Sequence, residues 1–347
     1  MTKKNSTLTT NEEKKVLPVS PIVLDHHIKT LAPLLQRWVD SGKISQVNLL
    51  TGQKGIGKRA MVHYIAQWLF CSEKENLLSP CQKCSHCLKA QNQSWVDFIE
   101  ISSSQTNEEN LKIEQFRNLK ETLGFGAFES PFKIIHIHNA EQLTTQAANS
   151  ILKLLEEPPP GWLFFITTHD ATLLLTTIVS RCQVVRLKPF SVTQIEKILE
   201  AHNTPKDRLP VAAKLAQGSY EKAIKLCSQE YWEIRNKFFK SLENPQNEMN
   251  LLIDQCAKTP VFFELILDLS ENIVEDIITG SNINYDYKNT ILKLSKNAEY
   301  KLGSLDAVQR FFLELGERIF KARHELETPV NKKLLIQEVL IPWVQLA

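Results

Sequence analysis

The sequence predicts an α/β domain built on a five-stranded parallel sheet, followed by a region made of helices alone. Three observations lead to this expectation. Short apolar segments alternate with amphipathic segments from about residue 20 to 190, as in a parallel sheet with helices on both faces. No strand pattern follows Pro189, and a cluster of cysteines interrupts the alternation between residues 71 and 87.

The composition is that of a globular protein of two or three domains. Of the 347 residues, 43% are hydrophobic and 23% are charged, which is ordinary for a soluble chain. The net charge of +2 argues against strong nonspecific binding of nucleic acid by this chain alone. No apolar run approaches the roughly 20 residues that span a bilayer, and the polar N-terminus lacks the apolar segment of a signal peptide. We therefore expect a cytoplasmic protein.

The first strand, VNLLT at 47–51, is followed by a glycine-rich turn and a helix. This order of strand, turn and helix is the context that a phosphate-binding loop requires. In such a loop the glycines let backbone N–H groups approach a phosphate, and the lysine lies against its terminal oxygens. The residues expected in these roles are Gly52, Gly55, Gly57 and Lys58.

The residue after Lys58 departs from a working nucleotide site. Loops that bind a magnesium nucleotide carry Ser or Thr there, because the hydroxyl is a magnesium ligand. This chain has Arg59, and a guanidinium has no lone pair to offer a cation. We therefore expect ATP binding to be weak or absent and hydrolysis to be lost, with the loop kept as a connection between strand and helix.

Four cysteines fall within 17 residues, at Cys71, Cys81, Cys84 and Cys87. Each C-x2-C pair lets two thiolates reach one ion from a tight turn, and four thiolates satisfy tetrahedral Zn²⁺. In a reducing compartment such a cluster indicates a metal site before it indicates disulfides. We expect a structural zinc module at about 71–90. The alternatives are four free cysteines, or His86 as a substitute ligand.

Two further strands are predicted at 96–101 and 133–138, with a helical pattern between them. ATPases with this kind of loop carry acidic residues at the end of the second of these strands, where they hold magnesium and activate water. Here His138 and Asn139 stand at those places. A neutral imidazole is a poor magnesium ligand, and an amide cannot act as a carboxylate base. Glu141 follows, and we expect it to be a solvated turn residue.

A helix that ends at Pro158 precedes the strand at 162–168, and 183–187 completes the five. Ser180-Arg181-Cys182 stands directly before the last strand. An arginine in that place is most often a surface residue or an ion-pair partner. The functional alternative is an arginine finger, which supplies positive charge to a γ-phosphate bound by a neighbouring chain.

Beyond Pro189 the sequence predicts helices only, and Ser191 with Gln194 forms a capping-box signature for the first of them. The expected organisation is a disordered tail at 1–20, an α/β domain at 21–189 that contains the zinc module, a helical lid at 190–230 and a helical domain at 231–347.

Four stretches, in this order, closely resemble the clamp-loader subunits of bacterial DNA polymerase III, which are AAA+ proteins. They are GQKGIGK at 52–58, PCQKCSHC at 80–87, NSILKLLEEPP at 149–159 and TTIVSRC at 176–182. The resemblance covers about residues 22–230, and the helical remainder fits the family's C-terminal collar, an oligomerisation domain, by class only. The ATPase branch, gamma/tau, keeps the Ser/Thr and the acidic pair. Arg59, His138 and Asn139 resemble instead the branch with a degenerate nucleotide site, delta-prime.

The resemblance implies a heteropentameric ring of gamma/tau, delta and delta-prime subunits that loads a sliding clamp on primed DNA. It implies that Arg181 enters the ATP site of the adjacent gamma/tau subunit. Thr168 matches the polar sensor position, with Thr167 as the adjacent alternative, and Glu221 stands where ATPase members carry a sensing arginine. Two other functions remain open: a catalytically active gamma/tau-like ATPase with unusual magnesium ligands, and a zinc-stabilised DNA-binding protein that acts alone.

Overall fold

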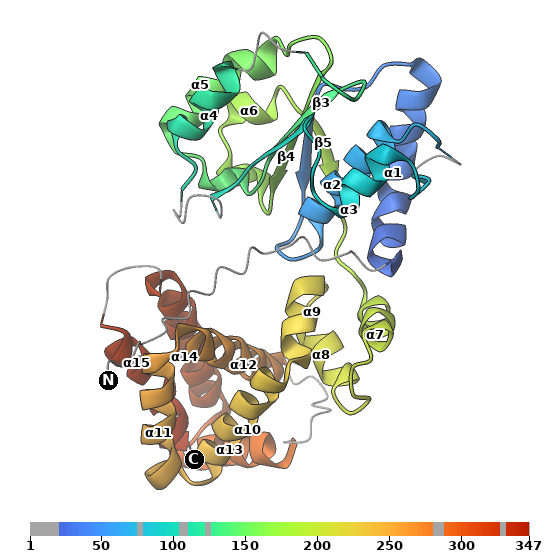
Figure 1. Ribbon diagram of the computed structural model, residues 1–347. Helices are drawn as coiled ribbons and strands as arrows, with labels where there is room; N and C mark the ends of the chain where they lie inside the picture. The colour runs from blue at the N-terminus through green and yellow to red at the C-terminus, as the bar shows by residue number, and fades with distance from the viewer. Residues whose placement is uncertain are drawn as a thin grey trace, which may run out of the picture. The chain divides into compact units, whose positions relative to one another are not determined.

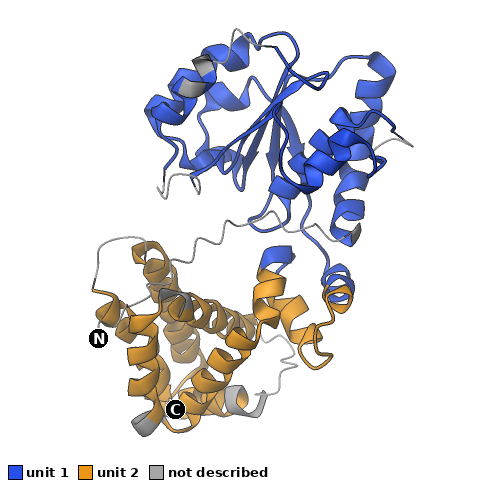
Figure 2. Cartoon of the chain, viewed as in Figure 1, with its two compact units in different colours: residues 1–198, 217–221 blue, residues 199–216, 222–347 orange. Residues whose placement is uncertain are grey.

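The structure is a computed structural model, and it describes residues 21–74, 79–103, 110–121, 126–279, 288–326 and 331–346. The predicted disordered tail at 1–20 lies outside these described residues. The contacts divide the chain into two compact units (Figure 2). The first holds residues 1–198 and 217–221, and the second holds residues 199–216 and 222–347. The predicted division into tail, α/β domain, lid and collar stays a prediction.

The first unit is built on a five-stranded parallel sheet, which confirms the predicted fold class (Figure 1). Its strands are β1 (Val47–Thr51), β2 (Phe98–Ile101), β3 (Lys133–Ile137), β4 (Trp162–Thr168) and β5 (Gln183–Arg186), in the order β2-β3-β4-β1-β5. Every neighbouring pair is parallel. β1, β3 and β4 are buried along their whole length, as expected of strands covered on both faces.

The helices that join these strands follow the predicted alternation. They are α2 (Lys58–Phe70), α3 (Ser85–Gln91), α4 (Ile113–Glu121), α5 (Thr145–Glu156) and α6 (Thr176–Val179). α5 begins at an N-cap, where the Thr144 hydroxyl accepts a hydrogen bond from the Ala147 N–H at 3.2 Å. It buries Ile151 and Leu155 in the core beside the sheet and ends directly before the predicted stop at Pro158.

A helix that the sequence reasoning did not assign, α1 (Pro21–Ser41), precedes the sheet. It buries Leu31, Leu35 and Trp38. The fully buried His27 donates a hydrogen bond from Nε2 to the carbonyl oxygen of Ile56 at 2.6 Å. Burial lowers the pKa of His27 to about 4, so the ring is neutral near pH 7. This contact ties α1 to the backbone of the glycine-rich loop.

The second unit consists of helices, as the sequence predicts for the region after β5. α7 (Val192–Ala201) and α9 (Tyr220–Cys227) each begin in the first unit and continue in the second. The others are α8 (Leu209–Leu215), α10 (Gln229–Glu243), α11 (Pro245–Lys258), α12 (Pro260–Thr279), α13 (Lys288–Leu302), α14 (Leu305–Glu325) and α15 (Lys332–Leu346). Trp343 is fully buried in this unit, with its ring centroid 6.0 Å from that of Phe238 and 6.2 Å from that of Phe312. Among the described helices, none combines the length and the apolar character needed to span a bilayer.

Candidate functional site

The glycine-rich loop lies at the carboxyl end of β1, the edge of a parallel sheet where ligands bind. Gly52, Gly55 and Gly57 have φ angles of 152°, 78° and 93°, which residues with a Cβ rarely adopt. Thr168 lies beside the loop, because it pairs with Thr51 in the register of β4 and β1. Its hydroxyl donates to the carbonyl oxygen of Asp170 at 2.9 Å.

Lys58 is turned back into its own loop. Its Nζ donates to the carbonyl oxygens of Gly52 at 2.6 Å and Gln53 at 2.9 Å, and the residue is 6% exposed. Burial lowers the pKa of Lys58 to about 8, although the carboxylates of Glu141 and Glu221 oppose this shift. The ammonium group that would meet a terminal phosphate therefore has partners within the chain.

The segment 217–221 covers the same loop. The backbone N–H of Glu221 donates to the Gly55 carbonyl oxygen at 2.9 Å. A Cβ added to Gly55 would lie 2.3 Å from the Ser219 hydroxyl and 2.9 Å from the Glu221 Cβ, so only glycine fits there. Glu221 therefore places a negative charge close to Lys58, where a bound phosphate would be repelled.

Arg59 points away from the loop and forms an ion pair with Glu100 at the end of β2. Its Nη2 donates to Oε1 at 2.5 Å and its Nε donates to Oε2 at 3.0 Å. His63 and His136 each place a ring nitrogen 3.0 Å from Oε2 of the same carboxylate. Glu100 and His136 are neighbours because β2 and β3 pair in that register.

This cluster holds one negative charge and one permanent positive charge. The Glu100 side chain is 9% exposed, and burial opposes its ionisation. Hydrogen bonds from His136, His63 and Arg59 outweigh burial and hold its pKa well below the usual range. Burial also lowers the pKa of His136, so that ring is neutral and donates from Nδ1 to the carboxylate.

The side chains of His63, Glu100 and His136 are close enough together to hold a metal ion. Both Glu100 oxygens already accept hydrogen bonds from Arg59, however, and each histidine has a hydrogen bond to the same carboxylate. The guanidinium is therefore the cation of this cluster, and hydrogen bonding alone accounts for its geometry.

His138 and Asn139 continue the network instead of forming a magnesium site. His138 Nδ1 lies 3.1 Å from the Thr167 hydroxyl oxygen, and the Asn139 N–H donates to that oxygen at 3.4 Å. The same hydroxyl lies 3.3 Å from His136 Nε2, and it can donate to that nitrogen. Burial lowers the pKa of His138 to about 3, and the nearby His136 adds to the shift. The end of β3 is thus a neutral hydrogen-bonded chain.

The prediction that Glu141 is a solvated turn residue is wrong. Its side chain is 13% exposed, and Oε1 accepts a hydrogen bond from His169 Nδ1 at 2.7 Å. Burial opposes ionisation of Glu141, but the nearby Thr168 hydroxyl and the hydrogen bond from His169 outweigh it and lower its pKa. The carboxylate is therefore charged and attracts the ammonium group of Lys58.

The four cysteines come together as the sequence predicts, between α2 and α3. The Sγ atoms of Cys71 and Cys84 are 4.0 Å apart, close to the roughly 3.8 Å that tetrahedral Zn–S bonds of 2.3 Å imply. The N–H of Cys81 donates to Cys71 Sγ and that of Cys84 to Cys81 Sγ, both at 3.3 Å. His86 is outside the cluster and contacts the Phe70 ring. The donor set fits a closed metal site.

Arg181 lies between α6 and β5, and the sheet places it away from the glycine-rich loop. The loop follows the carboxyl end of β1, whereas Arg181 precedes Gln183 at the amino end of the parallel strand β5. The guanidinium donates from Nε to Glu156 Oε1 at 3.0 Å and from Nη1 to the Thr177 carbonyl oxygen at 2.7 Å, and Nη2 also donates to Glu156. Arg181 therefore does not contribute to this chain's own nucleotide loop.

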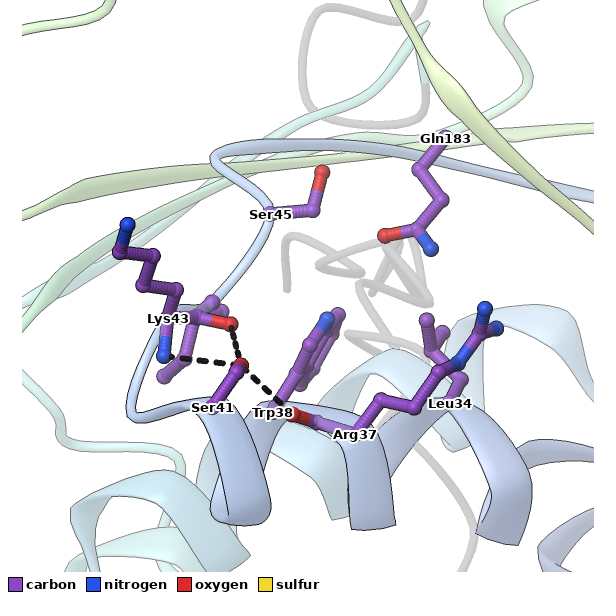
Figure 3. A pocket seen from close by; sticks show the side chains of 8 residues that line it. Leu34, Arg37, Trp38, Ser41, Lys43, Ser45 and Gln183 are labelled. Atoms are coloured by element: carbon purple, nitrogen blue, oxygen red, sulfur yellow. Dashed lines mark hydrogen bonds between the residues drawn. The ribbon is translucent and has the colours of Figure 1, made fainter.

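A shallow hollow of about 320 Å³ lies near the amino ends of β1 and β5 (Figure 3). Arg37, Trp38, Lys43 and Gln183 are among the side chains around it. The Ser41 hydroxyl beside it donates to the Arg37 carbonyl oxygen at 2.6 Å. None of the sequence-predicted site residues lines this hollow.

Sequence reasoning missed Glu100, His63 and His136. A signal was present, because Glu100 and His136 stand within apolar strands, and a buried polar side chain requires a partner. The spacing along the chain could not identify that partner, since it is set by the pairing of β2 with β3 and by the turn of α2 that carries Arg59 and His63.

The chain is similar in sequence to known subunits of DNA polymerase III. Residues 28–191 match the family described as "DNA polymerase III, delta subunit". The chain is 32% identical over 214 residues to subunit tau from Escherichia coli, a match that covers 60% of this chain but 32% of tau. It thus spans about a third of that relative's length.

Two other relatives match over most of their length. Subunit delta' from Bacillus subtilis is 25% identical, with 89% of this chain and 93% of the relative covered. Subunit gamma from Buchnera aphidicola (Schizaphis graminum) is 26% identical, with 86% and 88% covered. A gamma subunit-related protein from Thermotoga maritima superposes with a TM-score of 0.45 and 16% identity, over 91% of this chain and 98% of that one. These sequence matches support a member of the clamp-loader subunit family of DNA polymerase III.

Proposed function

We propose that this chain is a delta-prime-like, non-hydrolysing subunit of the DNA polymerase III clamp loader, which lends Arg181 to the ATP site of an adjacent gamma/tau-type subunit. One observation carries the proposal. Arg59 stands where an active loop needs a magnesium-binding hydroxyl, and it is held there by the buried carboxylate of Glu100. Lys58, bound to the carbonyl oxygens of its own loop, supports the same conclusion.

The proposed role of Arg181 needs no nucleotide in this chain. A guanidinium that enters a neighbouring site stabilises the negative charge on the transferring phosphoryl oxygens, and it can accelerate transfer by orders of magnitude. Arg181 suits this role because its side chain is 30% exposed and lies away from the chain's own loop. Loss of the nucleotide site therefore leaves the reason for this arginine intact.

The proposed partners follow from the family. The chain joins gamma/tau and delta subunits in a heteropentameric ring in the cytoplasm, with the helices of residues 231–347 as its collar, and the ring loads a sliding clamp on primed DNA. Matches to a delta' subunit and to a gamma subunit, over 93% and 88% of those relatives' lengths, support a place in such a complex.

Reconstitution of the complex tests the arginine finger. Arg181→Ala should lower the DNA-stimulated ATP turnover of the complex by roughly tenfold or more, because one active site loses its finger. Arg117→Ala on the exposed face of α4 is the matched control and should have no effect. Unchanged turnover in the Arg181 variant, with the complex still assembled, would remove the proposed role.

The alternative is a catalytically active gamma/tau-like ATPase. The 32% identity to tau supports this alternative. It requires another group to bind magnesium in place of the missing hydroxyl and carboxylates. ATP turnover by the purified chain, abolished by Lys58→Ala, would favour this alternative over the non-hydrolysing subunit.

We also propose that the metal of the cysteine cluster is a structural zinc ion. Elemental analysis should find one zinc per chain, and the double variant Cys81→Ser, Cys84→Ser should lose it and unfold at a lower temperature. Cys256→Ser, a buried cysteine outside the cluster, should keep the metal. A stable wild-type protein without any metal would contradict the zinc assignment.

A further inference from the structure

The guanidinium of Arg181 is held in one orientation by contacts on two sides. The Nε and Nη2 groups both donate to Oε1 of Glu156, with the Nε contact at 3.0 Å. On the other side Nη1 donates to the Thr177 carbonyl oxygen at 2.7 Å. Two donors on one carboxylate oxygen and a third on a carbonyl fix the plane of the group. Without such contacts, an exposed arginine side chain populates many rotamers.

These contacts leave part of the guanidinium available. Each Nη nitrogen carries two N–H bonds, and among the described residues the only partner of Nη2 is Glu156. The second N–H of Nη2 can therefore meet a phosphate oxygen. The second N–H of Nη1 makes only a long 3.4 Å contact, to the Ser180 hydroxyl, and it can meet a phosphate oxygen as well. The second N–H of Nη2 lies on the terminal edge of the guanidinium, because the first is directed with Nε toward Glu156.

Glu156 is well placed to hold the arginine, because it is the last residue of α5. The Thr144 cap fixes the start of that helix, and the burial of Leu154 and Leu155 fixes its end. α6, whose Thr177 carbonyl binds Nη1, packs against the same core through Ile178. The two acceptors thus belong to elements that a common core holds in place.

We propose that Glu156 is a positioning residue for Arg181. It holds the Nε side of the guanidinium so that the free N–H groups are presented to the triphosphate of the adjacent subunit. This inference rests on the proposed function, since it assigns Glu156 a role through the finger. An arginine already ordered before it meets the phosphate loses less conformational freedom in the transition state, which raises kcat more than it changes KM.

The test uses the reconstituted complex with clamp, primed DNA and ATP. Glu156→Ala should lower the DNA-stimulated kcat about 5- to 10-fold, with KM for ATP within about twofold of the wild-type value. Glu156→Gln keeps an acceptor oxygen and should recover part of the loss. Glu157→Ala changes the neighbouring exposed carboxylate and should leave kcat unchanged. Thermal melting of each isolated variant checks that it is folded.

A double-mutant cycle distinguishes positioning from other effects. If Glu156 acts through the arginine, Glu156→Ala in the Arg181→Ala background should cause no further loss. A wild-type kcat in both Glu156 variants, or fully additive losses, would overturn the inference and leave the finger in place. Should Arg181→Ala itself leave turnover unchanged, the proposed function and the positioning role both fail. If Glu156→Ala does not fold, the Glu156→Gln cycle gives the same decision.

Discussion

Arg59 and Arg181 have the same exposed side-chain fraction, 30%, but different partners. Arg59 neutralises Glu100, which is 9% exposed and is further contacted by two histidines. Arg181 pairs with Glu156, which is 46% exposed. An ion pair with a buried carboxylate is costly to break, whereas water readily replaces a partner at the surface. The first arginine is therefore committed to the charge balance of its own chain, whereas the second keeps an N–H group that Glu156 does not use and that can bind an anion.

The largest effect on stability is expected at Arg59. Arg59→Ala removes the only permanent positive charge on Glu100 among the described residues, and we expect the free energy of unfolding to fall by about 2–4 kcal/mol. Urea denaturation monitored by circular dichroism measures the change. A loss below about 0.5 kcal/mol would mean that the histidines alone satisfy Glu100, and the contrast between the two arginines would disappear.

The neutral histidines of the Arg59 region should make stability depend on pH. The folded pKa of His138 is about 3, below the ordinary value of 6.5. As the pH falls through 6.5, the unfolded chain therefore takes up the proton first and is favoured. Stability should be fully present above about pH 7 and fall by about 2–3 kcal/mol for this group by about pH 4.5.

Urea denaturation at several pH values checks this expectation. His138→Gln should reduce the slope, because the group whose pKa burial lowers is then absent. An identical slope in the His138 variant would show that this ring is protonated in the folded state, and that the network tolerates charge.

The smallest effect on stability is expected at Arg181. Arg181→Ala removes a pair with an exposed carboxylate, and we expect the free energy of unfolding to change by at most about 1 kcal/mol. The same urea experiment measures it beside Arg59→Ala. A loss of stability comparable to that of the Arg59 variant would identify Arg181 as a structural residue. It would count against the proposed role of Arg181 as an arginine finger.

Much of the fold could be predicted because its signals are local. Apolar runs define the strands, and glycines follow β1 where the backbone needs positive φ angles. Pro158 ends α5, and the cysteines lie close together along the chain. Each of these features depends on residues that are near neighbours in the sequence, so pattern and spacing are sufficient.

The contacts around the glycine-rich loop could not be predicted in the same way. Glu221 reaches Gly55 from 166 residues further along the chain, and Glu100 meets Arg59 from 41 residues away. Arg59, His138 and Asn139 indicated which magnesium-binding groups are missing at their positions, but only the packing of distant segments shows which side chains contact one another there. The partial burial of Glu141 was missed for the same reason. Its hydrogen-bond partner, His169, follows β4, whereas Glu141 follows β3.

The Arg59–Glu100 pair also has an evolutionary consequence. Restoring threonine at position 59 in one step would leave a buried carboxylate without its counter-charge, and β3 would still lack the acidic residues that hold magnesium. That single substitution would thus lose stability while supplying only one of the groups that an active magnesium site needs. The charge balance at this end of the sheet therefore protects arginine at position 59 from replacement.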